Sequence, residues 1–340
     1  MTDFVPLTAA RCRLGEGPVW VPALGQLWWL DIHRNTVHRY DWQSGESEAH
    51  ALSERSTFVV PCADGSAIGA RQKGLCRVPE QGRQAALTAP VSVPGPVSVP
   101  GPVSVTVPVE TGTPETSLND GKTGPDGRLY FGTRDLAQRR AMGGLYRLDD
   151  DLVARRLVDR VTTGNGLDWS PDASVLYFVD SGDYLVWAFD FDVRDGSVSG
   201  KRVFASVGEP DGLPDGLTVD AAGGVWVALF GGGMLHRYAP DGRLTEVIPV
   251  PVRYPTSCAF AGPGLDTLVV TSAYARIEDA GETPAELDGA VLAAETGAVG
   301  KPIALCRTPL GTTRPVNPSA WPTADATARS AKRSSSGWAT

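Results

Sequence analysis

The chain has 340 residues, of which 42% are hydrophobic and 21% are charged, and its formal net charge at pH 7 is −8. This apolar content is enough for a folded core, while the acidic balance argues against nucleic acid or an anionic membrane as a partner. The sequence shows no apolar leader and no apolar run long enough to span a bilayer, so we expect a cytoplasmic protein. Its five cysteines are scattered without a Cys-x-x-Cys spacing, which indicates reduced thiols and no zinc site.

Short strand-like segments follow one another along most of the chain. They are rich in Val, Trp, Tyr, Phe and Leu, and turn residues separate them. No convincing long amphipathic helix appears between them. In chain order, the predicted strands cover residues 26–32, 37–41, 67–70, 128–133, 145–148, 175–180, 185–191, 224–229, 234–238 and 267–272. The sequence therefore predicts an all-β fold.

One apolar strand returns at regular intervals, beginning near residues 27, 66, 128, 175, 224 and 267. Most intervals are about 40 to 50 residues, the usual length of a propeller blade, and one is about 62. Six such units predict a six-bladed β-propeller with four-stranded antiparallel blades around a central channel, because closing the ring leaves few exposed strand edges. A β-sandwich is the alternative, and the six-fold recurrence argues against it.

The one long interval has a visible cause in a tandem repeat. The unit Pro-Val-Ser-Val-Pro-Gly begins at Pro90, returns at Pro96 and begins again at Pro102. Because proline cannot donate a ladder hydrogen bond, we expect an extended or disordered surface loop near residues 90–107. The last residues, 309–340, are rich in Thr, Pro, Ser and Ala without strand alternation, so we expect a propeller domain over residues 1–308 and a disordered tail.

A polar residue followed by glycine recurs ahead of four of the apolar strands. The four pairs are Glu16-Gly17, Asp120-Gly121, Asn165-Gly166 and Asp215-Gly216. A lone pair of this kind is typical of a hairpin turn, but further turn signals, such as Ser170-Pro171-Asp172, follow some five residues later. We therefore place the pairs at the start of inner strands and expect their oxygens to converge at one end of the channel. Carboxylate and amide oxygens that meet at one point form a site for a hard divalent cation.

Other chemistries lack the residues that they need. The four histidines show no zinc-protease spacing, and no Gly-x-Ser-x-Gly elbow is present. No cysteine has an obvious partner base, and the run of three glycines at residues 231–233 is not followed by the Lys and Ser/Thr of a phosphate-binding loop. Nucleophilic catalysis therefore has no candidate.

The segments around the polar–glycine pairs resemble a known family. The matching segments are residues 14–20 (Leu-Gly-Glu-Gly-Pro-Val-Trp), 119–122 (Asn-Asp-Gly-Lys), 127–133, 165–172, 214–220 and 256–260. With them the chain, from about residue 11 to residue 306, resembles the senescence marker protein (regucalcin)/gluconolactonase family, whose relatives are six-bladed propeller lactonases.

The resemblance implies a role for each polar residue. Glu16, Asn165 and Asp215 would bind one divalent metal ion, with Asp215 also acting as general base, and Asn119 would contact the substrate together with Asp120. Calcium is the favoured ion, and zinc, magnesium, manganese and iron(II) are the alternatives. Such an ion can polarise a lactone carbonyl while a carboxylate orients or deprotonates the attacking water.

One position departs from the family pattern. Relatives usually carry an arginine two residues before the Asn-Asp-Gly, where it contacts the sugar, but this chain has Ser117 there. We expect Arg134, from a neighbouring strand, to take over the substrate contact. A glutamate that some members use just beyond this point has no clear equivalent in this chain.

The leading hypothesis is metal-dependent hydrolysis of a sugar lactone to the aldonic acid by a hydrolase of the gluconolactonase type. One alternative is a non-catalytic calcium- or sugar-binding propeller. Another keeps the fold and the hydrolysis but takes a non-sugar lactone or an organophosphate. In each case the partner is a small molecule, and we expect a monomer or a weak homo-oligomer.

Overall fold

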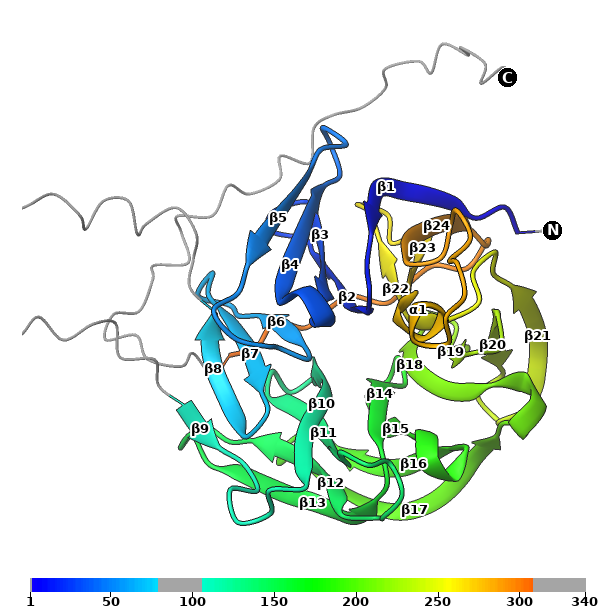
Figure 1. Cartoon of the computed structure of the whole chain (residues 1–340). Coiled ribbons are helices and arrows are strands. Elements are labelled where there is room, and N and C mark those ends of the chain that lie inside the picture. Colours follow the sequence, from blue (N-terminus) through cyan, green and yellow to red (C-terminus); the bar gives the residue numbers. More distant parts are fainter. Residues whose placement is uncertain (1, 79–105, 308–340) are drawn as a thin grey trace, which may run out of the picture.

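The computed structural model describes residues 2–78 and 106–307, and it forms six four-stranded antiparallel sheets arranged in a ring (Figure 1). Blade 1 consists of β2 (Gly15–Val21), β3 (Gln26–Asp31), β4 (Thr36–Asp41) and β5 (Ser47–Ala51). Blade 2 consists of β6 (Val59–Pro61), β7 (Ala67–Arg71), β8 (Gly74–Val78) and β9 (Thr106–Pro108). Blade 3 consists of β10 (Thr116–Thr123), β11 (Leu129–Asp135), β12 (Gly143–Leu148) and β13 (Ala154–Val161). The prediction of a six-bladed β-propeller is confirmed.

Blades 4 to 6 complete the ring. Blade 4 consists of β14 (Gly164–Trp169), β15 (Val175–Asp180), β16 (Leu185–Asp192) and β17 (Ser197–Ser206). Blade 5 consists of β18 (Leu213–Val219), β19 (Val225–Phe230), β20 (Met234–Tyr238) and β21 (Leu244–Pro249). Blade 6 consists of β22 (Pro255–Ala261), β23 (Thr267–Ser272), β24 (Ala290–Glu295) and β1 (Val5–Arg11). All ten strands predicted from the sequence are present.

The two ends of the described chain close the ring. Strand β1 pairs antiparallel with β24, so the N-terminal segment supplies the outer strand of blade 6. In Figure 1 the N-terminal strand lies beside β24 and next to blade 1. The chain therefore passes from the outer strand of blade 6 directly to the inner strand of blade 1, and β1 covers the edge of β24 that would otherwise be open.

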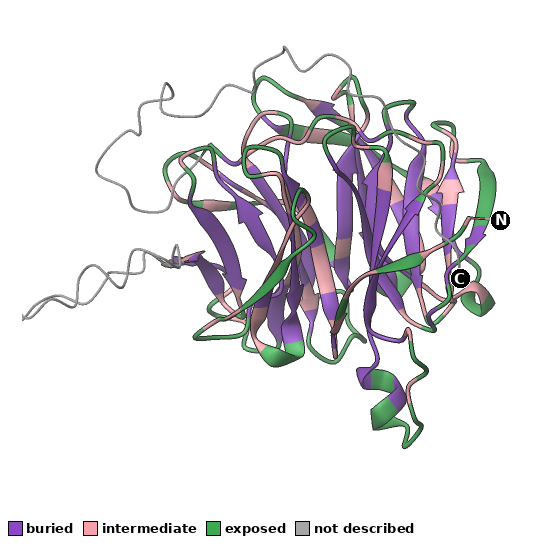
Figure 2. Ribbon diagram, turned by 90° about the horizontal axis from the view of Figure 1, so that it is seen from above, coloured by how far each residue is buried: buried purple, intermediate pink, exposed green. Residues whose placement is uncertain are grey.

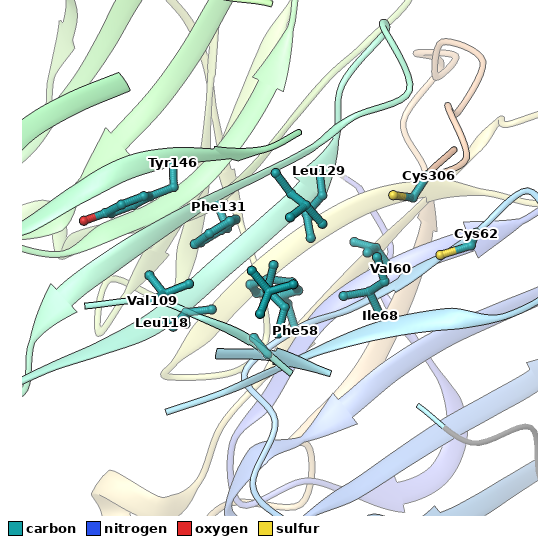
Figure 3. Close-up of a cluster of buried hydrophobic side chains, with 14 residues drawn as sticks. Phe58, Val60, Cys62, Ile68, Val109, Leu118, Leu129, Phe131, Tyr146 and Cys306 are labelled. Carbon is teal, nitrogen blue, oxygen red and sulfur yellow. The ribbon is translucent and has the colours of Figure 1, made fainter. Parts of the chain in front are cut away.

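The second strand of each blade is almost entirely buried, because blades on both sides cover it. In β15, for example, every residue after Val175 is buried. Figure 2 shows the same pattern, with buried strands inside the ring and exposed residues along the turns. Aromatic and aliphatic side chains fill the wedge between neighbouring blades: in Figure 3, Phe58, Val60 and Ile68 from the side of blade 2 meet Leu129 and Phe131 of blade 3.

The loop with the tandem repeat lies outside the described residues, and so does the tail after residue 307. The predicted loop near residues 90–107 is wrong at its last residues, because Thr106 and Val107 belong to β9. Val107 pairs with Leu75 of β8 and is only 2% exposed, so burial in blade 2 outweighs the loop character of the repeat.

Short helices lie in the connections on one face of the ring. They are η1 (Ile32–Arg34), η3 (Ser181–Asp183), η4 (Glu209–Asp211) and α1 (Ala275–Asp279). Across the described residues α1 is the only α-helix, in agreement with the all-β prediction. None of the helices among the described residues has the length and apolar character needed to cross a membrane.

The segment of residues 299–307 runs across the opposite face. The Ala221 amide donates to the Val299 carbonyl at 2.8 Å, the Cys306 amide to the Pro61 carbonyl at 3.0 Å, and the Arg307 amide to the Gly127 carbonyl at 2.8 Å. These contacts connect blades 5, 2 and 3 across the ring. The central channel is therefore covered at one end, and we call this its closed end.

Candidate active site at the open end of the channel

The polar–glycine pairs lie in the first strand of their blades, as the sequence predicts. At each of them the pairing with the second strand shifts register, which is the mark of a β-bulge. The shifts lie between Glu16 and Val19 in β2, Leu118 and Gly121 in β10, Gly164 and Leu167 in β14, and Pro214 and Leu217 in β18. A bulge changes the direction in which a side chain points and is common beside active sites. The repeated bulge therefore sets the polar side chains apart from the alternation of an ordinary strand.

The glycine of a pair is required where first strands of neighbouring blades approach each other. A Cβ on Gly166 would lie 2.2 Å from the Leu217 amide nitrogen, and one on Gly216 would lie 2.0 Å from Ser257 Oγ. No larger residue fits at either position without moving the backbone. The glycines thus bring the bulges of blades 4, 5 and 6 close together around the channel.

Three carboxyl groups meet at this end of the channel. Burial raises the pKa of Glu16 well above its ordinary value, and the charges of Asp215 and Asp120 raise it further. Burial followed by the charge of Asp120 raises the pKa of Asp215 in the same way, and burial raises the pKa of Asp120 to about 6. The charges of Asp120 and Asp215 therefore reach Glu16, and that of Asp120 reaches Asp215, so the three carboxyl groups lie near one another at this end of the channel.

The two asparagines are fixed by hydrogen bonds. Asn165 Nδ2 donates to Ser181 Oγ at 3.1 Å, and Asn165 lies close enough to Asp215 to lower the pKa of its carboxyl. The bond to Ser181 engages one N–H of the amide, and Oδ1 is the atom that can coordinate a cation. Asn119 Nδ2 donates to the Gly164 carbonyl at 3.0 Å, so Asn119 is held beside the start of β14.

The donor set of Glu16, Asn165 and Asp215 fits a hard divalent cation. All three supply oxygen atoms, which calcium and magnesium prefer, and none supplies the sulfur or imidazole typical of structural zinc. The two carboxylates make no ion pair with a lysine or arginine of the described chain, so a cation there would offset their repulsion. Within the described residues, no cluster of three or more His, Cys, Asp or Glu side chains has a metal-binding arrangement. The proposed set of ligands is of another kind, because it combines two carboxylates with the side-chain amide of Asn165.

Arg134 reaches the same site from the second strand of blade 3. It stands directly opposite Ser117 in the β10–β11 pairing, so it neighbours the position where relatives carry arginine. Burial lowers its pKa, the charge of Arg55 lowers it further, and the charges of Asp215 and Glu16 oppose this effect. Its Nε is buried without a hydrogen-bond partner among the described residues.

Two residues beside the site carry no signal in the sequence. Ser181 accepts from Asn165 and donates through Oγ to the Pro214 carbonyl at 2.6 Å, so it connects the bulges of blades 4 and 5. Phe58 lies against the bulges of blades 1 and 3: a Cβ on Gly121 would meet its ring at 2.7 Å, and one on Gly17 would lie 4.0 Å from its Cα. A single Ser directly after a strand, or a single Phe directly before one, is too common to be singled out in advance.

Deeper in the channel, another buried carboxylate has a different environment. Asp168 of β14 accepts from Lys122 Nζ at 2.8 Å and from Lys301 Nζ at 2.5 Å, and also from the Val219 amide at 3.1 Å. Burial would raise its pKa, but the charges of the two lysines hold that pKa well below its usual range. These residues border a cavity of about 80 Å³ that the first strands and residues 300–304 enclose.

Comparisons with known proteins agree with the fold and with the motifs. A family model described as the SMP-30/Gluconolactonase/LRE-like region matches residues 14–274. The chain is 31% identical over 295 residues to the pentonolactonase XacC of Haloferax volcanii, which covers 86% of this chain and 94% of that protein. It is 31% identical over 265 residues to the regucalcin of Danio rerio, which covers 77% of this chain and 83% of that protein.

A solved structure has a similar fold. The regucalcin of Agrobacterium tumefaciens, described as a calcium-binding protein, superposes with a TM-score of 0.77 at 27% identity, covering 89% of this chain and 96% of that one.

Proposed function

We propose that the chain, which belongs to the SMP-30/gluconolactonase/LRE-like family, hydrolyses a sugar lactone to the aldonic acid with the help of one divalent metal ion. The observation that carries the proposal is the set of oxygen side chains at the bulges of blades 1, 4 and 5. Glu16, Asn165 and Asp215 come from these bulges, and neither carboxylate forms an ion pair with a lysine or arginine of the described chain, although the charge of Arg134 acts on both. Calcium is the favoured ion because every donor is a hard oxygen atom.

The reaction adds water across the lactone ester bond. Asp215 orients a water molecule and accepts its proton while the water oxygen bonds to the carbonyl carbon. The ring C–O bond then breaks, and the proton passes to the leaving oxygen, which becomes a hydroxyl group of the open acid. A bound divalent ion supplies polarisation of the lactone carbonyl and stabilises the negative charge that develops on its oxygen.

The remaining polar residues hold the substrate. Asn119, fixed by its bond to the Gly164 carbonyl, and Asp120 lie on blade 3 beside the three metal-binding candidates. Arg134 supplies guanidinium N–H groups from the adjacent strand, in place of the arginine that Ser117 replaces. Phe58 lies against Gly17 and Gly121 and covers one side of the site, which limits access of bulk water.

A pH-indicator assay with glucono-, galactono-, xylono- and arabinono-lactone tests this function. We expect acid release above the uncatalysed rate in the presence of calcium or another divalent ion, loss of that activity with a chelator, and recovery when the ion is returned. Hydrolysis that a chelator leaves unchanged would rule out the metal. Absence of hydrolysis with calcium, zinc, magnesium, manganese and iron(II) would rule out the lactonase.

A second candidate is a calcium- or sugar-binding propeller without catalysis. The replacement of the family arginine by Ser117 favours it, and so does the description of the Agrobacterium regucalcin as a calcium-binding protein. The same assay separates the two, because the second candidate binds the ion or the sugar and releases no acid.

A further inference from the structure

Three arginines lie along one side of the open end of the channel. Arg55, Arg134 and Arg276 form no hydrogen bond or ion pair through their guanidinium groups with the residues that the structure describes. Most other arginines in the described chain are paired: Arg13 with Glu278, for instance, at 3.3 Å. Unpaired guanidinium groups that gather around a site favour an anionic ligand, because their donors remain available.

Arg134 lies between two of the bulges. It pairs with Ser117, two residues before Asn119, and forms a separate bridge with Thr163, two residues before Asn165. Its Nε is buried, so the side chain lies over the site and not in bulk water. A buried guanidinium N–H without a partner is costly, and a ligand oxygen would relieve that cost.

The other two arginines are exposed and come from segments that adjoin the bulge of blade 1. Arg55 lies three residues before Phe58, whose ring and backbone pack against the bulges of blades 1 and 3. Arg276 belongs to α1, which Figure 1 shows beside the inner end of blade 6. The Ala275 amide of this helix donates to the Arg13 carbonyl at 3.0 Å, three residues before Glu16.

Charges are divided between two arcs of the rim. Arg55, Arg134 and Arg276 lie on the arc of blades 6, 1, 2 and 3, which also carries Asp279 and the Glu278 that pairs with Arg13. The acidic residues of η3 and η4, which are Asp183, Glu209 and Asp211, occupy the arc of blades 4 and 5. The charge of Arg134 acts on Glu16 and Asp215, and a divalent cation bound to these carboxylates would leave its guanidinium group available to an anionic ligand.

We propose that the substrate is a lactone carrying a carboxylate or phosphate group outside the ring, and that Arg134, Arg55 and Arg276 bind this group. The inference rests on the proposed lactonase function and defines its substrate class. The lactone carbonyl lies toward Glu16, Asn165 and Asp215, and the anionic group lies toward the arc of blades 6 to 3. Arg134 makes the deepest contact, and the two exposed arginines attract the anion at the entrance.

The test measures kcat/KM for three lactones of similar ring structure: neutral glucono-δ-lactone, glucarolactone with its added carboxylate, and phosphogluconolactone. We expect at least one acidic lactone to exceed the neutral one by about tenfold. A preference for glucarolactone identifies a carboxylate group, and one for phosphogluconolactone identifies a phosphate. Added salt lowers the acidic-to-neutral ratio, because it screens the exposed arginines.

Substitutions test which arginines bind the anionic group of the substrate. Arg134→Gln lowers the acidic-to-neutral ratio of kcat/KM about tenfold, and Arg55→Gln and Arg276→Gln lower it about threefold each. The matched control is Arg243→Gln, an exposed arginine in the turn before β21 on the opposite face, which leaves the ratio unchanged. If neutral lactone is hydrolysed and the ratio stays near one in every variant, the anionic substrate is wrong and the lactonase stands. If no lactone is hydrolysed with any divalent ion, both proposals are wrong.

Discussion

Carboxylates at the two ends of the central channel have opposite environments. At the open end, Glu16, Asp120 and Asp215 face one another, and burial raises the pKa of each. Nearer the closed end, Asp168 lies between two lysines that lower its pKa. Strand β14 supplies residues to both environments, because Asn165 and Asp168 are three positions apart.

We interpret Asp168 as a structural group and the carboxylates of the open end as the groups of the proposed site. Asp168 has its opposite charge within the protein, and Lys301 brings that charge from the segment that covers the channel, so this ion pair holds the fold together. The carboxylates of the open end have no such partner in the described chain, and their repulsion remains for a ligand to offset. A carboxylate without an ion-pair partner therefore indicates the proposed site, and a buried carboxylate with such a partner indicates a structural role.

The largest expected effect is on stability. Asp168→Ala leaves Lys122 and Lys301 with no carboxylate, and we expect the free energy of unfolding to fall by about 3–5 kcal/mol. Urea denaturation followed by tryptophan fluorescence measures it. Asp190→Ala, which removes an exposed carboxylate paired with Arg202 in the outer half of blade 4, is the control and changes stability little. An Asp168→Ala variant as stable as this control would contradict the structural role.

The next effect is on catalysis. Asp215→Asn keeps an oxygen that can coordinate the ion but loses the base, so lactone hydrolysis at saturating metal falls by about 10² or more. Asn165→Ala weakens metal affinity instead, and excess cation partly restores its activity. Steady-state rates across a metal titration distinguish the two variants. An Asp215→Asn rate near that of the wild type would assign catalysis to metal polarisation alone, with Asp120 as the next candidate for positioning water.

A smaller effect, opposite in sign at the two ends, is expected from pH. The folded-state pKa of Asp120 is raised to about 6, so its contribution to stability is lost as pH rises through that value. In metal-free protein, Asp120→Asn should therefore gain about 1–2 kcal/mol over the wild type between pH 4 and 7.

The pKa of Asp168 is lowered, so its contribution is complete above its unfolded pKa of about 4 and is lost as pH falls below it. Denaturation of Asp120→Asn and Asp168→Asn at several pH values measures both effects. The same sign of pH dependence in the two variants would contradict the distinction between the ends of the channel.

The smallest effect is expected from the tandem repeat. Deleting one Pro-Val-Ser-Val-Pro-Gly unit, residues 96–101, should leave the melting temperature nearly unchanged, because loop-closure entropy varies slowly with length. Differential scanning fluorimetry tests it. A fall of more than a few degrees would indicate that the segment packs against the propeller.

Local patterns in the sequence were enough to predict the blades and the location of the polar–glycine pairs in the first strands. The apolar second strands repeat at blade length because each is buried between neighbours, and the glycine of each pair is needed where first strands come close, as at Gly166 and Gly216. Both requirements produce a pattern that can be recognised within a few residues of the sequence. The positions of Glu16, Asn165 and Asp215 could therefore be predicted without a structure.

Pairings between residues that are distant in the sequence produce no such local pattern. Strand β1 closes blade 6 with residues that lie almost a chain length away, and four of its seven residues are exposed, so it lacks the apolar pattern of the other strands. The register that sets Arg134 opposite Ser117 depends on the bulge in β10. Lys301 reaches Asp168 only because its segment runs across the ring. These contacts depend on register and topology, which a local pattern does not specify.

The central claim is that the unpaired carboxylates of the open end hold a metal ion. Calorimetric titration of calcium into metal-stripped protein tests it most directly, with wild type, Asp168→Asn and Asp215→Ala compared after circular dichroism has shown that each is folded. The account predicts one ion per chain in the wild type and in Asp168→Asn, and no binding in Asp215→Ala. Unchanged binding in Asp215→Ala, or none in the wild type with any of the five divalent ions, would contradict it.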